Sequence, residues 1–533
     1  MTTSTLFKSF NPSSASWYPD GWDDSIKFGN NLRFSYPGSE LSDSTKTMKK
    51  NDIFVVLPGK NFSLPDLIEK IKAASPSALL IDNKFERISK KEFSQNNLVF
   101  YKNLKNQIGF IASGFYKNPS EDLDIVAVTG TDGKTSVVNM LAAAVAKTST
   151  KTAAIGSLGV VVYQENGQKK TLKIYSDIGL TTPSPVVIQN IFSFLRKHKV
   201  EKVFLEASSI GITEKRLLGT KIGSALFTSL GHDHLDYHGS IEQLAFAKAE
   251  LFAHPNLRKI VFTKKKSSDL PELRIIHNVI KKSKAKKIYV DSVGIGELEK
   301  TKNELDILLK ELDSSMAGTK VGLFSKNLDP QEFIVNIFGP HNLQNLSLVA
   351  GYLLETIEFE NLPDLLKTLK TPIGRFELII SKNFPVVCVD YAHTPGALDV
   401  TLKTLRKILD SPDGNLICVF GCGGNRDKAK RSYMGKIASE KSNWGIITAD
   451  NPRYESLEVI TSQIFVGISS DLKKNWTIIN DRENAIATAI KQAKAQDIIL
   501  VAGKGHESTQ EINGNFINFS DREVVTRILS GSK

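Results

Sequence analysis

The sequence predicts a multi-domain α/β protein, and three observations support this prediction. With 533 residues, the chain is too long for one ordinary hydrophobic core. Hydrophobic residues make up 41% and charged residues 24% of the chain, which is typical of folded globular proteins. In the last third, apolar runs of strand length alternate with helical patterns, as in β-α-β units that build a parallel sheet.

Residues 1–118 are expected to form a small α/β domain. Two apolar runs, DIFVVLPG (52–59) and SALLIDN (77–83), have the length and composition of strands. A helical pattern lies between them at 64–74. Residues 1–40 carry no motif, so we assign them only to this domain.

Residues 119–372 open with VAVTGTDGKTSVVN (126–139), in which a strand-like run meets a glycine-rich turn and a helical pattern that starts at Ser136. Gly130 and Gly133 let backbone N–H groups approach phosphate oxygens, Lys134 can reach the outer phosphates and Thr135 can ligate magnesium. The alternative is a glycine-rich turn with a surface lysine. Val128 stands where the longer form of this loop has its first glycine.

Asp132 places a negative charge inside this loop. We predict that its carboxylate turns away from phosphate and caps the following helix by accepting backbone N–H bonds.

Two further segments of this region carry candidate metal ligands. Glu206 ends the apolar run KVFLE, where a carboxylate can hold a hard cation or serve the fold. The second segment contains several possible zinc ligands, namely His232, Asp233, His234, Asp236 and His238. One crowded loop, however, rarely places its side chains in the tetrahedral arrangement of a zinc site. Magnesium would take only one or two of these groups. Lys248, nearby, has the pattern of an ordinary helical lysine.

Residues 373–533 predict a doubly wound domain. The expected strands are Val386–Val389, Leu416–Phe420, Trp444–Thr448, Trp476–Ile479 and Ile498–Ala502, with helices near 396–409, 428–440, 456–471 and 482–494. Asn513-Gly514 in EINGNFINF predicts a β-hairpin.

Three polar segments each follow one of these strands directly: GCGGNRD (421–427), DNPR (450–453) and GKGHE (503–507). Ligands of such sheets bind beyond the carboxyl ends of the strands, so we expect the three segments to form one site. Arg426 and Arg453 can bind carboxylates and Glu507 can pair with an ammonium, which together suits an amino acid. A solvated cluster of salt bridges is the alternative.

The formal charge of +12 favours an anionic partner, but lysine runs such as 281–287 lack the interleaved aromatic residues of a nucleic-acid surface. Three cysteines, none in a C-x-x-C pair, indicate a reducing compartment. The N-terminus lacks a signal-peptide core, and no run approaches the ~20 apolar residues that span a bilayer. We expect a cytoplasmic monomer without membrane insertion.

Nine segments occur in a fixed order between about Ser42 and Leu529: GTDGKTS, EASS, DHLDYHG…AKAELF, GPHNLQN, GRFE, DYAHTPGAL, FGCGGNRDKAKR, DNPR and GKGHE. In combination they resemble the Mur ligase family, the ATP-dependent amide-forming enzymes of bacterial peptidoglycan synthesis. The resemblance implies three domains: a UDP-binding α/β domain (1–118), a P-loop-type mononucleotide-binding ATPase domain (119–372) and a Rossmann-like domain for the incoming amino acid (373–533).

The resemblance implies a role for each matching residue. It implies ATP binding by Gly130, Thr131, Asp132, Gly133, Lys134, Thr135, Ser136, Asn342, Asn345, Arg375 and Asp390. It implies magnesium binding by Thr135, Glu206, His234 and a carbamylated Lys248, with catalysis by Lys134, Glu206, His234 and Lys248. It implies binding of UDP-MurNAc-dipeptide by Ser44, Thr181, Thr182, Ser208 and Arg216, and of diaminopimelate by Arg426, Asp450, Asn451, Pro452, Arg453, Gly503 and Glu507.

The implied reaction adds meso-2,6-diaminopimelate to UDP-MurNAc-L-Ala-D-Glu through an acyl phosphate formed with ATP, and a C-terminal domain that closes over the reactants is expected. In the family, DNPR accompanies diaminopimelate, whose second carboxylate suits arginine. The family pattern usually has asparagine at position 132, valine at 207, histidine at 210 and arginine at 45, where this chain has Asp132, Ala207, Ile210 and Thr45. DNPRYESL also lacks the proline often found just after the acidic pair.

Four alternatives stay open. The same reaction with lysine or ornithine would change only the acceptor. A folylpolyglutamate synthase-like ligase would share the loop but lack DNPR and GKGHE. A P-loop ATPase acting on a partner would hydrolyse ATP without these substrates, and a silent scaffold would keep only the fold.

Overall fold

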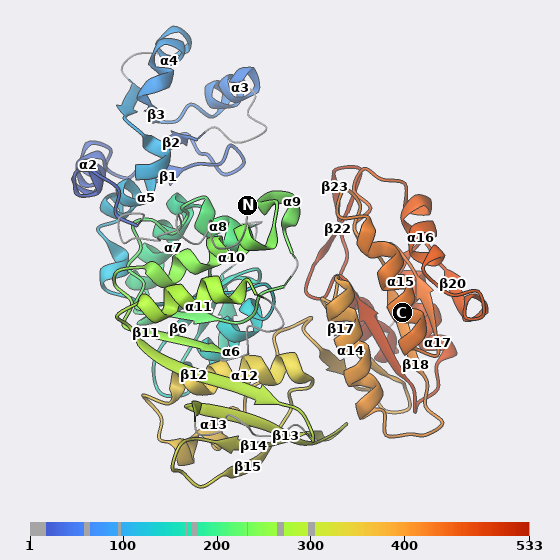
Figure 1. Ribbon diagram of the computed structural model, residues 1–533. Coiled ribbons are helices and arrows are strands. Elements are labelled where there is room, and N and C mark those ends of the chain that lie inside the picture. Colours follow the sequence, from blue (N-terminus) through green and yellow to red (C-terminus); the bar gives the residue numbers. More distant parts are fainter. Residues whose placement is uncertain are drawn as a thin grey trace. The chain divides into compact units, whose positions relative to one another are not determined.

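The computed structural model describes residues 17–57, 64–93, 97–165, 168–172, 180–231, 233–263, 271–296 and 304–531 (Figure 1). The chain divides into two compact units, Met1–Tyr289 and Val290–Lys533. The division into three domains, 1–118, 119–372 and 373–533, stays a prediction. None of the described helices is both long and apolar enough to cross a lipid bilayer.

The first unit begins with a four-stranded parallel sheet in the order β1-β2-β3-β4. Its strands are β1 (Leu41–Ser42), β2 (Ile53–Val56), β3 (Ala78–Asp82) and β4 (Leu98–Tyr101), and its helices are α2 (Trp22–Ser35), α3 (Leu64–Ala74), α4 (Glu86–Glu92) and α5 (Leu104–Phe115). The two strands and the helix predicted in this region are confirmed, except that residues 58 and 59 of the first run lie outside the described residues. Helices α2 and α5 approach closely, since a Cβ on Gly29 would lie 2.0 Å from the Ile111 carbonyl oxygen.

The larger sheet of the first unit contains the predicted nucleotide loop. Within this unit the strand order is β11-β10-β5-β9-β6-β7-β8. These strands are β5 (Asp124–Thr129), β6 (Thr152–Gly156), β7 (Gly159–Tyr163), β8 (Lys169–Thr171), β9 (Lys202–Glu206), β10 (Ser224–Phe227) and β11 (Lys259–Thr263). The helices are α6 (Lys134–Ala146), α7 (Pro185–Lys197), α8 (Ser209–Thr213), α9 (Leu235–His238), α10 (Ile241–Ala249) and α11 (Leu273–Lys282).

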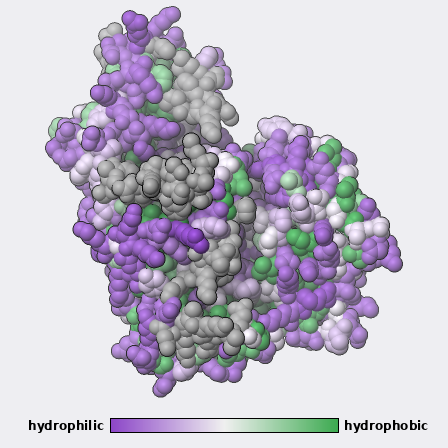
Figure 2. Space-filling model, in the orientation of Figure 1, coloured by the Kyte–Doolittle hydropathy of each residue, from purple (hydrophilic) through white to green (hydrophobic). Residues whose placement is uncertain are grey.

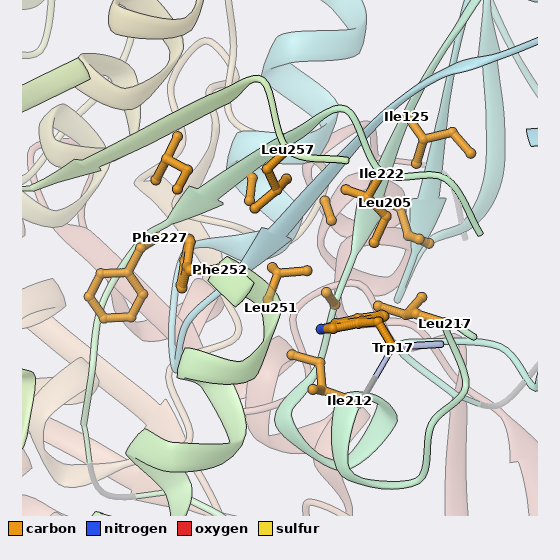
Figure 3. Packing of buried hydrophobic residues seen from close by; sticks show 14 of the residues in the cluster. Trp17, Ile125, Leu205, Ile212, Leu217, Ile222, Phe227, Leu251, Phe252 and Leu257 are labelled. Atoms are coloured by element: carbon orange, nitrogen blue, oxygen red, sulfur yellow. The ribbon is translucent and has the colours of Figure 1, made fainter. Parts of the chain in front are cut away.

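The core of this unit fixes the position of that sheet. β5 lies between β9 and β10 and is parallel to both, so both of its edges are paired, and its apolar residues are buried in the core. Figure 3 shows Trp17 packed among Ile212 and Leu217, and its indole Nε1 donates to the Glu250 carbonyl oxygen at 3.1 Å. Phe227 and Phe252 meet edge to face, at 6.2 Å between ring centroids.

β12 (Lys286–Val293) crosses the boundary between the units and pairs in parallel with β13 (Ile307–Ser315). β14 (Gly318–Phe324) and β15 (Gln331–Val335) continue as antiparallel strands, followed by α12 (Pro340–Leu353) and α13 (Leu362–Leu366).

The rest of the second unit is the predicted doubly wound sheet, in the order β16-β17-β21-β18-β19-β20. Its strands are β16 (Glu377–Ile379), β17 (Val386–Asp390), β18 (Leu416–Phe420), β19 (Trp444–Ile447), β20 (Trp476–Ile478) and β21 (Ile498–Ala502), and only β16 is antiparallel to its neighbour. The helices are α14 (Pro395–Ile408), α15 (Ala429–Lys441), α16 (Leu457–Val466), α17 (Arg482–Gln492) and α18 (Asp521–Leu529). Separate apolar clusters cover its two faces, as alternating side chains of buried strands require.

Two local predictions of this region can be compared directly. α16 ends at Val466, five residues before the predicted end. The next residue, Gly467, packs against the Ser432 carbonyl oxygen so closely that a Cβ would lie 1.9 Å away, so this position requires glycine. The predicted hairpin is confirmed as β22 (Thr509–Ile512) and β23 (Asn515–Asn518), with Asn513 and Gly514 both at positive φ in the turn.

The described surface in Figure 2 is mostly hydrophilic, and its apolar residues occur singly or in small groups. The three cysteines, Cys388, Cys418 and Cys422, are buried and free. Burial raises the pKa of all three thiols, which makes them unreactive in the folded protein.

Candidate active site

The predicted phosphate loop connects β5 to α6. Gly133 adopts a left-handed conformation (φ 86°) and stands at the helix N-cap, so α6 begins at Lys134, two residues before the predicted start. A Cβ on Gly130 would lie 1.9 Å from the Thr228 hydroxyl, so this position requires glycine. Thr131 N–H donates to the Ser229 carbonyl oxygen at 2.8 Å. These contacts fix the loop against the segment that follows β10.

Two lysines converge on one carbonyl of this loop. Lys134 Nζ donates to the carbonyl oxygens of Gly130 (2.9 Å) and Thr131 (2.8 Å). Lys248 Nζ, on α10, donates to the same Gly130 oxygen at 2.8 Å and is only 2% exposed. Its burial and then the charge of Lys134 hold the pKa of Lys248 well below its usual range, against the opposing charges of Asp233 and Asp132. An amine in this environment favours its neutral, nucleophilic form.

The capping role predicted for Asp132 is wrong. The N-cap of α6 is Gly133, which has no side chain, and within the described part of the chain no side chain caps this helix. Asp132 is exposed, and its backbone rather than its carboxylate makes contacts: its N–H donates to the Ser229 hydroxyl at 3.0 Å.

Glu206 is the buried carboxylate at the end of β9, 1% exposed. Its two oxygens accept hydrogen bonds from Ser157 N–H (2.9 Å) and the Ser157 hydroxyl (3.3 Å). The space for this carboxylate comes from Gly156, where a Cβ would lie 2.1 Å from Glu206 Oε1.

His234 precedes α9 in a left-handed conformation (φ 51°), with its Nε2 at 3.4 Å from an oxygen of Asp233. Partial desolvation lowers the pKa of His234, Lys134 and Lys248 add to this effect, and Asp233 opposes it. A neutral imidazole is the form that binds metal. Across the described ranges, no three His, Cys, Asp or Glu side chains gather as a metal site; His232 lies outside those ranges.

The residues predicted to bind the nucleotide-sugar dipeptide form a connected group. The Thr182 hydroxyl donates to the Glu206 carbonyl oxygen and lies 2.9 Å from the Ser208 hydroxyl. Arg216 Nη1 donates to the Thr182 carbonyl oxygen at 2.9 Å. The Thr181 hydroxyl lies 3.4 Å from the Ser157 hydroxyl, which contacts Glu206. This group therefore lies directly beside the candidate metal ligand Glu206.

Ser44 lies in the loop after β1, and its neighbour Asp43 connects that loop to the same group. Burial raises the pKa of Asp43, while a hydrogen bond from Ser184 and the charge of Arg216 lower it. Asp43 was not predicted as a site residue, because its interaction partners Ser184 and Arg216 are far away along the chain.

In the second unit, the three predicted loops meet at the carboxyl ends of β18, β19 and β21, which are adjacent strands. Glycines permit the contact: a Cβ on Gly424 would lie 1.9 Å from the Pro452 carbonyl oxygen, and one on Gly503 would lie 2.7 Å from Asp450 Oδ2. Arg426 is exposed at the end of the first loop. The three loops therefore lie together, as expected, and their use as one ligand site stays a prediction.

Lys504 is the buried centre of this region, and the sequence analysis missed it. Its Nζ donates to Asn451 Oδ1 (3.0 Å), Glu507 Oε2 (2.8 Å) and the Thr509 carbonyl oxygen (2.8 Å), which uses all three of its N–H groups. Asn451 Nδ2 donates to the same Glu507 oxygen at 2.8 Å. Glu507 is therefore held through Oε2, while Oε1 makes no hydrogen bond to another described residue. Lys504 is part of the motif GKGHE, but a lysine between two glycines gives no indication in the sequence that its side chain is buried.

Arg453 is held by residues of two other loops. Its Nε donates to Glu511 Oε2 at 2.9 Å and its Nη1 to the Gly424 carbonyl oxygen at 2.8 Å. Glu511 lies in the hairpin after GKGHE and was also missed, since an acidic residue in a strand is usually solvated.

The remaining predicted nucleotide contacts lie elsewhere in the second unit. Asn342 and Asn345 are buried on α12, and Asn342 Nδ2 donates to the Phe338 carbonyl oxygen at 2.9 Å. The Arg375 guanidinium lies 4.2 Å from the ring centroid of Tyr391. Both oxygens of Asp390 accept hydrogen bonds at 2.9 Å, from Phe376 N–H and from the Thr401 hydroxyl.

Comparison with known proteins matches two family models, the Mur ligase middle domain at residues 128–353 and the Mur ligase glutamate ligase domain at 374–505. UDP-N-acetylmuramoyl-L-alanyl-D-glutamate–2,6-diaminopimelate ligase of Rickettsia rickettsii is 34% identical over 495 residues, covering 92% of this chain and 95% of that protein. A solved structure of a ligase with the same name is 27% identical, with a TM-score of 0.58 and coverage of 92% and 94%.

MurF ligase from Thermotoga maritima, solved in complex with ADP, has the same fold at 16% identity, with a TM-score of 0.60 and coverage of 87% of this chain and 93% of that chain. The two family models together span more than half of the sequence, and the Rickettsia ligase matches it almost from end to end. The chain belongs to the Mur ligase family.

Proposed function

We propose that this protein is the ATP-dependent ligase that joins meso-2,6-diaminopimelate to the glutamate carboxylate of UDP-MurNAc-L-Ala-D-Glu. One observation carries the proposal: a cation, Arg453, and an anion, Glu507, belong to one hydrogen-bonded network at the carboxyl ends of adjacent strands. Each keeps polar atoms available, which suits a ligand with both a carboxylate and an ammonium. The names of the relatives support the same substrates.

ATP would bind at the loop Gly130–Ser136. The loop offers backbone N–H groups at the start of α6 together with the ammonium of Lys134, and both favour phosphate. Among the described residues, Lys134 donates hydrogen bonds only to carbonyl oxygens of the loop, and no described carboxylate is hydrogen-bonded to its ammonium. Lys134 would exchange those carbonyls for phosphate oxygens.

The residues near the loop suit magnesium. Glu206 supplies buried carboxylate oxygens, Thr135 a hydroxyl, and His234 an imidazole whose pKa favours the neutral form. Oxygen donors are the ligands that magnesium prefers. When bound, Mg²⁺ would neutralise negative charge on the phosphate oxygens.

Lys248 would become a further oxygen ligand by carbamylation. Its buried, neutral amine would add to the carbon of CO₂ and release a proton, which leaves a carbamate with two oxygens. The carbamate would place an anion beside the positively charged Lys134, so the two side chains would attract each other.

The chain's own residues would then position the reactants. Thr181, Thr182, Ser208 and Arg216 would hold the dipeptide next to Glu206, where its glutamate carboxylate takes the γ-phosphoryl group and ADP leaves. Glu507 and Arg453 would hold the two ends of diaminopimelate. Its free amine attacks the acyl carbon, and phosphate leaves as the amide forms. We place this reaction in the cytoplasm, with a monomeric enzyme.

Phosphate release tests the proposal. We expect release only when ATP, Mg²⁺, UDP-MurNAc-L-Ala-D-Glu and meso-diaminopimelate are all present, and mass spectrometry should find the tripeptide product. Parallel assays with lysine and ornithine identify the acceptor. Release that needs neither the dipeptide nor an amino acid would contradict the proposal and favour an ATPase that acts on a partner.

A further inference from the structure

Glu511 makes three hydrogen bonds to the DNPR segment. Its N–H donates to Asn451 Oδ1 at 3.0 Å, its carbonyl oxygen accepts from Arg453 N–H at 3.0 Å, and its Oε2 accepts from Arg453 Nε at 2.9 Å. Asn451 and Arg453 are two positions of the proposed acceptor site. One residue of β22 therefore contacts both of them, across a separation of about sixty positions in the chain.

The backbone of Arg453 depends on this hairpin. Arg453 has a positive φ of 54°, a conformation that non-glycine residues rarely adopt without support. Its N–H bonds to the Glu511 carbonyl oxygen, and its own carbonyl oxygen accepts from Asn513 N–H at 2.7 Å. These two bonds make a local bridge between the DNPR segment and β22. The hairpin thus supports the conformation from which the arginine side chain departs.

The side chain of Arg453 is oriented by two acceptors. Glu511 takes the Nε–H and the Gly424 carbonyl oxygen takes one N–H of Nη1. Gly423 leaves room for this arrangement, since a Cβ there would lie 2.9 Å from Nη1. Nη2 makes no hydrogen bond to another described residue, and the side chain is 22% exposed. The guanidinium is consequently fixed at one end and available at the other.

We propose that Glu511 is a positioning residue that sets selectivity for an acceptor with a second carboxylate. It acts through Arg453: by holding Nε, it directs the remaining N–H groups of the guanidinium toward that carboxylate. This inference rests on the proposed function, in which Arg453 binds the acceptor. A lysine acceptor has no such carboxylate, so the contribution of Glu511 is confined to diaminopimelate.

Four variants test the proposal: Glu511→Ala, Glu511→Gln, Arg453→Ala and the double variant Glu511→Ala/Arg453→Ala. Asn515→Ala, at an exposed position of β23 in the same hairpin, is the matched control. The measurements are KM and kcat for diaminopimelate, lysine and ATP, with the melting temperature of each variant.

Glu511→Ala is expected to raise KM for diaminopimelate about 10-fold or more, the effect of losing one hydrogen bond to a charged group, while KM for ATP stays unchanged. The preference for diaminopimelate over lysine falls by the same factor. Glu511→Gln keeps an oxygen that accepts from Nε and should retain most of the preference. In the Arg453→Ala background, Glu511→Ala should change nothing further, because the residue acts through the arginine.

Two results would overturn the inference. If Arg453→Ala loses the use of diaminopimelate while Glu511→Ala behaves like Asn515→Ala, Glu511 does not position the arginine, and the proposed function stands. If Glu511→Ala lowers kcat with all substrates and also in the Arg453→Ala background, Glu511 supports the folded structure in general and does not act through Arg453. If the wild-type enzyme uses lysine as efficiently as diaminopimelate, the proposed identity of the acceptor is wrong.

Discussion

Arg482 and Asp521 form a bidentate ion pair in which both side chains are buried. Arg482 Nε lies 2.7 Å from Asp521 Oδ1, and Nη2 lies 2.8 Å from Oδ2. The same guanidinium donates to the carbonyl oxygens of Ala449 (3.1 Å) and Ala502 (2.9 Å), the residues directly before the DNPR and GKGHE segments. The pair therefore connects α17 and α18 to the two strand ends that carry the proposed acceptor site.

Asp521→Ala should lower the free energy of unfolding by about 3–5 kcal/mol, because it leaves the Arg482 cation buried without its partner. Urea denaturation measures the change. The control is Glu483→Ala, which removes the exposed ion pair between Glu483 and Arg527 on the same two helices and should cost about 1 kcal/mol or less. Equal losses for the two variants would contradict the structural role of the buried pair.

Lys248→Ala should lower kcat about 100-fold or more, since it removes the group proposed to carry the carbamate. Lys248→Arg supplies a basic side chain of similar length that cannot form a carbamate, so we expect it to be equally inactive. Bicarbonate should raise the activity of wild-type enzyme prepared with little CO₂, and leave both variants unchanged. Glu242→Ala, on the same helix, is the control. An active Lys248→Arg enzyme would exclude the carbamate.

Asp132→Asn should lower KM for ATP by up to about 5-fold, because an exposed charge contributes at most about 1 kcal/mol. The carboxylate is exposed in the phosphate loop and does not cap α6, so its charge acts against phosphate. Raising the salt concentration should reduce the difference between the two enzymes. An unchanged KM at low salt would show that the carboxylate does not face the nucleotide.

His254 should make stability depend on pH. Burial lowers its pKa from 6.5 to about 4. Its Nε2–H donates to the Thr220 carbonyl oxygen, and Nδ1 accepts from Asn256 N–H, so the neutral ring is the form that fits. As the pH falls below 6.5, the unfolded chain takes up the proton first. The contribution of His254 to the free energy of unfolding is therefore fully present above about pH 6.5. It decreases as the pH falls from 6.5 to about 4, and it does not change further below pH 4.

Over that interval the free energy of unfolding should fall by about 3 kcal/mol on account of this residue. Urea denaturation at several pH values, compared between wild type and His254→Gln, measures the slope rather than the absolute stability. The slope of the variant should be smaller between pH 4 and 6.5. The same slope in both proteins would mean that other groups determine the acid sensitivity.

Much of the second unit could be predicted from local pattern. Each of the five predicted strands is present, because a short apolar run between two helical patterns leaves little choice of structure. It could also be predicted that DNPR and GKGHE lie close together, since parallel strands place their carboxyl ends at one edge of the sheet. The predicted end of α16 lay five residues too far along the chain, because a hydrophobic pattern marks the existence of a helix more sharply than its last residue.

The sequence by itself determined where the phosphate loop lies, which loops share an edge of the sheet and to which family the chain belongs, because these depend on short motifs and on the order of strands and helices. Only the tertiary structure decided that Asp132 is not a cap, that Lys504 is buried and that Glu511 holds Arg453. These facts depend on pairs of residues far apart in sequence, such as Asn451 and Lys504, and on whether water is excluded between them. Burial and hydrogen-bond geometry arise from packing, and no local pattern specifies them.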